Sequence, residues 1–473
     1  MFDLMVGLVL GVNFGQLVMH FWFSDPVNIF FLFLGSNQSG AYFGHMDSVD
    51  LLRKLIRFRT ISSTSSATGE YVACANFILS ELELITRGSA EFSCYLLPEA
   101  PASSPVVVGK YAGSDPTLPC VLLNCHYDVV PADAADWTQA EPFSGTMKDG
   151  RVYGRGAQDM KCVVAQYISA IRRLPVQNKR TIYLTFVPDE EIGGAGMACF
   201  LDSTLFKEEI GGKDNIAIAL DEGLASESDV FSVFYGERLP WWVEISSKGN
   251  TGHGSRFIEN TAIEQLIDLS NKALAFRSDQ KAILHGTNEY ADHSNCAHSV
   301  ARKKLGDVTS LNITTLKAGV PNGDGSYCKN VVPPAASMTL DIRISPKVEP
   351  KAIGDMLTGW CKECSKNEGL AWSFIGHGND FAGHSTTPID STNPWYQHFV
   401  DGVKLSGIDV VPEVFPAATD SRFLRAIGVR ALGFSPMRNS EILLHENDEN
   451  IKVDVFLEGV EVYVKLISHL ANS

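Results

Sequence analysis

Short apolar segments alternate along this chain with longer segments of helical periodicity, and this alternation restricts the fold more than any other feature. Residues 121–125, 181–187 and 216–220 are apolar and rich in β-branched or aromatic side chains, as buried strands are. Residues 159–174 carry apolar side chains at the i, i+3, i+4 and i+7 positions of an amphipathic helix. Strands that alternate with helices predict an α/β fold with a mixed, largely parallel sheet flanked by helices.

The pattern changes near Trp241. Residues 242–247 and 338–344 alternate apolar and polar side chains, as strands with one buried face do, and residues 262–276 between them have helical periodicity. The sequence therefore predicts a smaller α+β domain inserted into the larger one. The predicted ranges are 46–238 and 348–473 for the large domain and 239–347 for the inserted domain.

The N-terminal range 1–45 is an apolar extension. The run from Leu4 to Phe23 is apolar and uncharged, and about 20 such residues can span a bilayer. However, the first basic residue of the chain is Arg53, whereas signal peptides and anchors usually carry basic residues beside the apolar core. Three interpretations stay open: a membrane anchor through residues 4–35, a signal segment, or a misassigned start upstream of Met46.

Composition restricts the compartment and the partners. The net charge of −16 disfavours nucleic acid and anionic membranes, because phosphate would be repelled. The 10 cysteines are scattered, and several lie in apolar segments. In a long chain this is typical of reduced, buried thiols in a cytoplasmic protein. Cys361 and Cys364 form one isolated C-x-x-C pair, which is too few ligands for a structural zinc site.

Metal-capable side chains follow apolar segments or begin a helix at five places, and sites in α/β sheets form at the carboxyl ends of strands. Each place alone also has an ordinary interpretation: a structural histidine, a helix N-cap for Asp159, or a solvated acidic loop. Together they supply nitrogen and oxygen ligands suited to a pair of zinc ions. These side chains are His126, Asp159, the neighbouring Glu190 and Glu191, Glu222, and His445.

Longer motifs surround these residues. They read HYDVVP from His126, RGAQDMKC from Arg155, FYGER from Phe234, PAATDSRFLR from Pro416 and ALGFSPM from Ala431. With these motifs the chain, from Val49 to Leu470, resembles the M20 family of zinc metallopeptidases, which includes carboxypeptidases, dipeptidases and aminoacylases. The resemblance is greatest to the aminoacylases. It implies a zinc-peptidase-like catalytic domain with an inserted domain that serves as lid and dimerisation domain.

The family pattern implies two zinc ions per subunit, with Asp159 bridging them. One ion would bind His126, Asp159 and Glu222, and the other Asp159, Glu191 and His445. Glu190 matches the general base.

Other positions match residues outside the metal ligands. Asp128 matches the residue that orients His126, and His253 matches a histidine that reaches the partner subunit's site in a homodimer. Asn330 and Arg343 match polar residues of the lid that contact substrate. Asp420 and Arg422 lie in a family motif beside the site.

The resemblance implies hydrolysis of N-acyl-L-amino acids, N-acetyl amino acids among them, to a carboxylate and a free amino acid. Zinc-activated water would attack the acyl carbonyl with Glu190 as the base. Two alternatives stay open: a dipeptidase or carboxypeptidase of the same clan, and a catalytically silent, zinc-stabilised interaction protein. The segments 285–304 and 319–329 are longer than is usual in the family and could alter lid closure.

Overall fold

The structure is a computed structural model, and it describes residues 47–175, 177–286, 303–365, 368–375 and 384–473. Upstream it describes only the backbone of β1 (Val9–Asn13), β2 (Gln16–His20) and the beginning of α1 (Ser39–Arg57). The expectations for the apolar segment 4–35 and for the loop 285–304 therefore fall largely outside the described residues. None of the helices in the described part is long and apolar enough to cross a membrane.

An eight-stranded sheet forms the centre of the larger unit, with the order β17-β10-β18-β9-β5-β8-β4-β3. The pairs β5–β8, β5–β9, β9–β18 and β10–β17 are parallel, whereas β3–β4, β4–β8 and β10–β18 are antiparallel. The predicted mixed, largely parallel α/β sheet is thus confirmed. Its strands are β3 (Phe92–Leu96), β4 (Val107–Tyr111), β5 (Cys120–His126), β8 (Ile182–Val187), β9 (Ile216–Asp221), β10 (Phe231–Glu237), β17 (Val410–Phe415) and β18 (Ala431–Gly433).

Helices cover both faces of this sheet because successive strand residues point to opposite faces. Val121 and Leu123 of β5 belong to one buried cluster, and Leu122 between them belongs to another. The first cluster packs under α1, α3 (Glu70–Thr86), α4 (Lys161–Ile171), α8 (Pro394–Lys404) and α10 (Val453–Asn472). The second packs under α5 (Ala195–Asp202), the π-helix η3 (Leu205–Ile210) and α9 (Ser421–Ala426). Short elements complete the unit: α2 (Ser65–Thr68), β6 (Thr146–Lys148), β7 (Arg151–Tyr153) and β19 (Asn450–Lys452).

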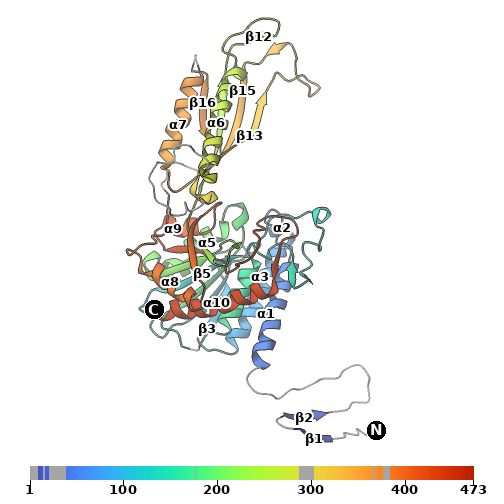
Figure 1. Ribbon diagram of the computed structural model, residues 1–473, viewed down its shortest axis with the longest axis vertical. Coiled ribbons are helices and arrows are strands. Elements are labelled where there is room, and N and C mark those ends of the chain that lie inside the picture. Colours follow the sequence, from blue (N-terminus) through green and yellow to red (C-terminus); the bar gives the residue numbers. More distant parts are fainter. Residues whose placement is uncertain are drawn as a thin grey trace.

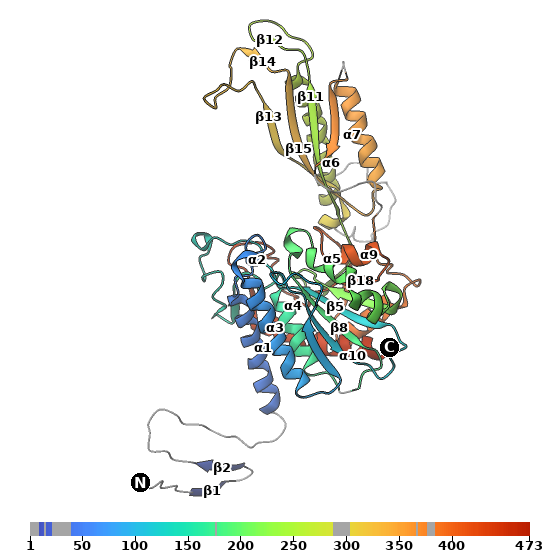
Figure 2. The same ribbon diagram turned by 180° about the vertical axis from the view of Figure 1, so that it is seen from behind.

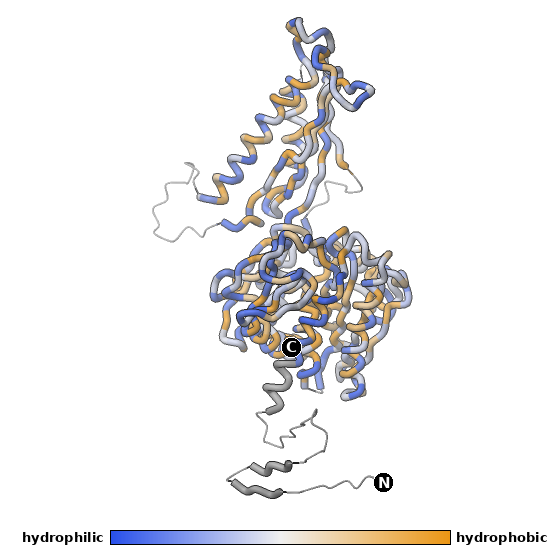
Figure 3. Tube along the Cα trace, turned by 90° about the vertical axis from the view of Figure 1, so that its right-hand side faces the viewer, coloured by the Kyte–Doolittle hydropathy of each residue, from blue (hydrophilic) through white to orange (hydrophobic). Residues whose placement is uncertain are grey.

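A second, smaller unit rises from this body, as Figures 1 and 2 show. Its four-stranded antiparallel sheet has the order β13-β15-β11-β16. Side chains of β11 alternate between buried and half-buried or exposed, so one sheet face packs on α6 and α7. In Figure 3 the helices of this unit likewise carry hydrophobic and hydrophilic residues on successive turns. The elements are β11 (Leu239–Lys248), β12 (Gly252–His253), α6 (Ala262–His285), β13 (Ser310–Ala318), β14 (Val331–Val332), β15 (Ala335–Ile344), α7 (Pro350–Cys364) and β16 (Leu370–Phe374).

The second hydrophobic core extends past residue 347, the boundary expected from the sequence. Ile353, Leu357 and Cys361 of α7 and Leu370 of β16 are buried in it. The helical periodicity after Pro350 therefore belongs to this unit and not to the larger one. We propose that the inserted domain, called the lid domain below, spans 239–375.

Three neighbouring parallel strands end at the same edge of the main sheet. His126 is the last residue of β5, β8 ends at Val187, and β9 ends at Asp221. Since β5 lies between β8 and β9, the residues that follow the three strands converge.

Candidate metal centre

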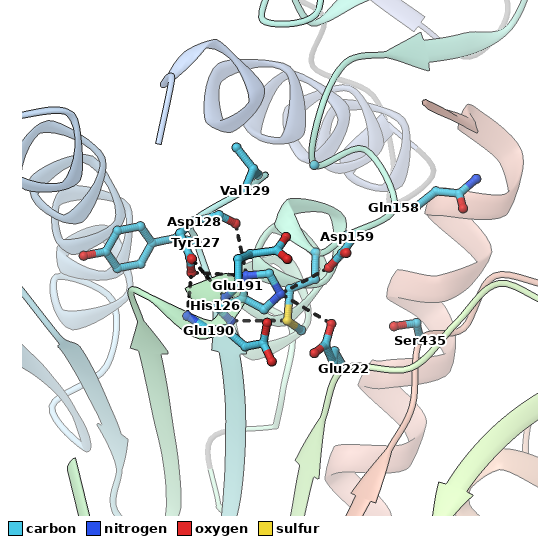
Figure 4. Close-up of polar contacts among 12 residues, drawn as sticks. His126, Tyr127, Asp128, Val129, Gln158, Asp159, Glu190, Glu191, Glu222 and Ser435 are labelled. Atoms are coloured by element: carbon cyan, nitrogen blue, oxygen red, sulfur yellow. Dashed lines mark hydrogen bonds and ion pairs between the residues drawn. The ribbon is translucent and has the colours of Figure 1, made fainter. Parts of the chain in front are cut away.

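His126 lies at the middle of a cluster of acidic side chains at this edge (Figure 4). Its Nε2 atom is 3.1 Å from Asp159 Oδ1 and 3.4 Å from Glu222 Oε2. Glu222 follows β9 directly, and Asp159 stands just before α4. His126 is 1% exposed and Glu222 4%, so the three ligand-type groups meet away from bulk water.

The second histidine approaches Asp159 from the other side. His445 Nε2 is 3.2 Å from Asp159 Oδ2 and 3.1 Å from Glu191 Oε2. The two oxygens of Asp159 thus face different histidines, which is the arrangement that a bridging carboxylate requires. The His445 side chain is 48% exposed, so this half of the cluster is open to solvent.

The cluster holds more negative charge than buried groups tolerate without cations. Burial, reinforced by neighbouring carboxylates, raises the pKa of Glu190, Glu191 and Glu222. For His126, burial lowers the pKa, but Glu222, Asp128 and Asp159 outweigh burial and raise it well above its usual range. Ligand atoms of His126, Glu190 and Glu222, and of His126, Asp159 and Glu191, lie within 4.8 Å of one another. This donor set fits divalent metal ions.

Asp128 contacts both His126 and the loop that carries the two glutamates. His126 Nδ1 is 3.0 Å from the Asp128 carbonyl oxygen and 3.4 Å from its carboxylate Oδ1. The same carboxylate accepts hydrogen bonds from the backbone N–H groups of Glu190 at 3.2 Å and Glu191 at 3.3 Å. The sequence predicted only the contact with histidine. The structure adds that one buried carboxylate aligns a histidine and two glutamates.

The ordinary interpretation of Asp159 as a helix N-cap is wrong. The cap of α4 is Met160, and the Asp159 carboxylate faces the two histidines instead. The loop before α4 is held by Glu449, which is fully buried. Glu449 Oε1 accepts hydrogen bonds from the backbone N–H groups of Gln158 and Asp159, at 2.6 and 3.1 Å. Its Oε2 accepts from Gly156 N at 3.0 Å.

Arg155 joins this loop to the segment that carries His445. Its Nη1 pairs with Glu449 Oε2 at 2.9 Å, and its Nη1 and Nη2 donate to the carbonyl oxygens of Glu446 and His445 at 3.1 and 3.2 Å. Sequence reasoning missed Glu449, although it lies only four residues beyond His445. We refer to this ion pair as the Arg155–Glu449 clamp.

Glu190 occupies a sharp turn after β8. Asp189 adopts a left-handed φ of 66°, and the 3-10 helix η2 (Glu190–Ile192) begins immediately after it. Glu190 is 8% exposed, and its Oε1 is 4.0 Å from Arg422 Nη1. Asp420 is buried nearby, and neither carboxylate oxygen has a hydrogen-bond partner among the described residues.

Comparison with known proteins identifies the family. The Peptidase family M20/M25/M40 matches residues 122–469. The chain belongs to this family. Aminoacylase-1 of Dictyostelium discoideum is 41% identical over 90% of the chain and 98% of its own length, and Aminoacylase-1 of Homo sapiens is 40% identical over 90% and 95%. The M20 fold is also that of a dinuclear metal-binding peptidase of Bacillus subtilis, at a TM-score of 0.59 and 15% identity, which covers 91% of this chain and 98% of that one.

In this M20 chain, two of the expected site residues lie together but apart from the acidic cluster. β12, which ends with His253, pairs with β14 at the apex of the lid domain, at the far end from the larger unit, called the catalytic body below (Figure 1). Gly254 N donates to the Asn330 carbonyl oxygen at 2.7 Å, and His253 and Asn330 are both exposed. His253 Nδ1 contacts the Ser255 hydroxyl at 2.7 Å.

Arg343 lies on β15, near the base of the lid domain. Its guanidinium donates two hydrogen bonds to Asp341, at 2.7 and 2.9 Å, so its charge is already paired. The structure thus brings together the five expected metal ligands, Glu190 and Asp128. It places His253, Asn330 and Arg343 elsewhere in the single chain.

Proposed function

We propose that this chain is a metal-dependent aminoacylase that hydrolyses N-acyl-L-amino acids to a carboxylate and a free amino acid. The observation that carries the proposal is a buried glutamate, Glu190, beside an acidic cluster whose other members each contact a histidine. Relatives about 40% identical over nine-tenths of the chain are aminoacylases, which favours acyl-amino acids over dipeptides as substrates. A silent interaction protein is not favoured, because neither the base nor a ligand is missing.

The metal site is proposed to hold two zinc ions per subunit. His126 and Glu222 would bind one ion, Glu191 and His445 the other, and Asp159 would bridge them through its two oxygens. When bound, such ions lower the pKa of water and polarise an amide carbonyl. The buried glutamates support this assignment, because burial of several carboxylates is stable only beside cations.

Glu190 would move the protons of the reaction. It accepts a proton from the attacking water as the new C–O bond forms, and it donates that proton to the amide nitrogen as the C–N bond breaks. Burial raises the pKa of Glu190, which suits a group that must both accept and donate near neutral pH. Asp128 fixes the position of this carboxylate through the backbone N–H of Glu190.

The free carboxylate of the substrate needs a cation close to the base. Arg343 matches a lid residue that contacts substrate in the family, but to bind this carboxylate it would first have to leave Asp341. Arg422 lies 4.0 Å from Glu190, and its side chain is 29% exposed. We therefore favour Arg422 as the residue that holds the substrate carboxylate, since guanidinium groups bind carboxylates in a bidentate manner.

His253 and Asn330 would act in a homodimer. Because they lie at the apex of their own lid domain, they could reach a catalytic centre only in a second copy of the chain. In such a dimer each His253 would stabilise negative charge on the acyl oxygen in the partner's site. The described cysteines are free thiols, which supports a reducing, cytoplasmic location.

The test is a substrate panel with a matched pair of variants. Metal-loaded protein should hydrolyse N-acetyl-L-methionine at a kcat/KM well above that for dipeptides such as Gly-Met. Glu190→Gln should lower kcat by about 10²–10⁴-fold while the metal content stays unchanged. The control Glu208→Gln, an exposed acid on η3, should behave as wild type. A preference for dipeptides, or near-normal turnover by Glu190→Gln, would contradict the proposal.

A further inference from the structure

A separate cavity of about 320 Å³ lies at the base of the lid domain. Ten residues line it: Arg238, Arg277, Gln280, Lys281, Leu284, Leu305, Val308, Thr309, Ser310 and Asn312. Three of them are cations and none is acidic, in a chain whose net charge is −16. None of them belongs to the metal centre. The volume lies in the range of cavities that hold small molecules.

The inner cation, Arg238, is 5% exposed and has no carboxylate within 4.0 Å in the described part of the chain. Its Nε donates to the Pro416 carbonyl oxygen at 2.7 Å, and its Nη1 donates to Ser310 Oγ at 2.9 Å. Buried arginines are normally paired with an acid. Burial is the main cause that lowers the pKa of Arg238 to about 10; Arg343 acts in the same direction and Asp341 acts against it. A buried guanidinium without a contacting acid would be stabilised by an anion at this point.

The outer wall of the cavity is one face of α6. Arg277, Gln280, Lys281 and Leu284 follow one another at the three- and four-residue spacing that aligns side chains along a helix. Arg277 and Lys281 are exposed at the rim. Arg277 Nε donates to Asn312 Oδ1 at 3.1 Å, and among the described residues its Nη atoms have no hydrogen-bond partner.

Apolar side chains complete the lining. Val308 is 4% exposed, whereas Leu305 is 46% exposed, and Leu284 is half-buried. A small inorganic anion would satisfy the cations but would leave Leu284 and Leu305 facing water. The lining therefore matches a molecule with a negative head and a short apolar tail.

We propose that this cavity is a second ligand site, distinct from the metal centre, that binds small monocarboxylates with an apolar tail. The carboxylate contacts Arg238, Arg277 and Lys281, and the tail packs on Leu284, Leu305 and Val308. The inference does not depend on the proposed activity, because none of these residues is placed in the catalytic machinery.

The site lies where the lid domain contacts the larger unit. Gly306, beside the cavity, packs so closely on Val414 of β17 that a Cβ atom would lie 2.1 Å from the Val414 carbonyl oxygen. Lys304 Nζ is 3.5 Å from Glu413 Oε1 of the same strand. A bound carboxylate would therefore contact α6 of the lid domain and Arg238, which is tied to the catalytic body through Pro416.

The test is calorimetric titration of the full-length, metal-loaded protein with sodium hexanoate. The double variant Arg277→Gln/Lys281→Gln removes the two rim charges, and Lys362→Gln, an exposed lysine on α7, is the matched control. Wild type and Lys362→Gln should bind hexanoate alike, and the double variant should bind it about tenfold more weakly or worse. Hydrolysis of N-acetyl-L-methionine without hexanoate, measured in parallel, should be the same in all three proteins.

Two results would overturn the inference. Hexanoate affinity that is equal in wild type and the double variant would mean that any hexanoate bound is held elsewhere. Inorganic phosphate or acetate that binds as tightly as hexanoate would mean that the apolar wall contributes nothing. Loss of hydrolysis in wild type itself would count against the proposed function and not against this site.

Discussion

The Arg155–Glu449 clamp should control both stability and metal affinity, and Glu449→Gln tests this. The buried carboxylate accepts hydrogen bonds from three backbone N–H groups and from Arg155. In the variant the amide oxygen can still accept hydrogen bonds from the backbone N–H groups of Gln158 and Asp159. The NH₂ group, however, is itself a donor and would face two other donors, Arg155 and the N–H of Gly156. A buried guanidinium without its partner costs about 3–5 kcal/mol.

The effect should reach the metal ligands at both ends of the clamp. Glu449 positions the backbone of Asp159, and Arg155 donates to the carbonyl oxygen of His445. Removal of supporting contacts of this kind typically lowers metal affinity by about 10–100-fold. We therefore expect Glu449→Gln to lose about 3–5 kcal/mol of unfolding free energy and to need at least about tenfold more free zinc for half-maximal activity.

The assays are urea denaturation of metal-free protein and activity titrated with buffered zinc. Glu441→Gln is the matched control, because this exposed acid lies in the same segment and offers only its backbone carbonyl oxygen, to Gln158. The control should stay within about 0.5 kcal/mol of wild type. If Glu449→Gln behaves like the control in both assays, the clamp does not hold the site.

Three further predictions follow from the site and the core. Chelation of the metal should lower the melting temperature of the protein, and added zinc should restore it. The reason is that a ligand at 100 times its Kd stabilises the native state by about 2.7 kcal/mol. An unchanged melting temperature would mean that the cluster holds no metal. Homodimers of Glu190→Gln and homodimers of His253→Ala should each be inactive. When the two variants are mixed and exchange subunits, about a quarter of wild-type activity should return, because half of the dimers are mixed and one of the two sites in each mixed dimer is intact. No recovery would show that His253 does not act in the partner's site. Burial raises the pKa of the Cys74 and Cys120 thiols to about 12, so both stay neutral at pH 8. Mass spectrometry should therefore show that iodoacetamide modifies the partly exposed Cys328 before either of them. Equal rates for Cys74 and Cys328 would contradict this packing.

Local patterns were sufficient to predict the three central parallel strands and the residues that follow them, but not all eight strands of the main sheet. β5, β8 and β9 are short apolar runs, and parallel strands place their carboxyl ends together, so convergence of His126, Glu190 and Glu222 follows from the order of strands. His445 and Asp159 are not at the ends of these strands. Their place in the cluster came from resemblance to the M20 family, because no rule of spacing joins residues so far apart.

Other features depend on tertiary contacts that leave no periodic trace. The clamp joins Arg155 to Glu449 across nearly 300 positions, and an acid in a polar loop resembles any solvated residue until its burial is known. α6 continues to His285, past the predicted end at Phe276, and it stops only at Gly286, which has a left-handed φ of 68°. β16 extends the lid domain because it pairs with β11, and α7 does so because its apolar side chains share a core with those of β11 and β15. Sequence order alone does not specify these contacts.

Anomalous X-ray scattering from crystals of zinc-loaded protein, recorded on either side of the zinc absorption edge, tests the central claim most directly. Two strong peaks should flank the Asp159 carboxylate, one beside His126 and Glu222 and the other beside Glu191 and His445, with Glu190 bound to neither ion. A single peak, peaks away from Asp159, or Glu190 as a direct ligand would contradict the assignment of five ligands and one base.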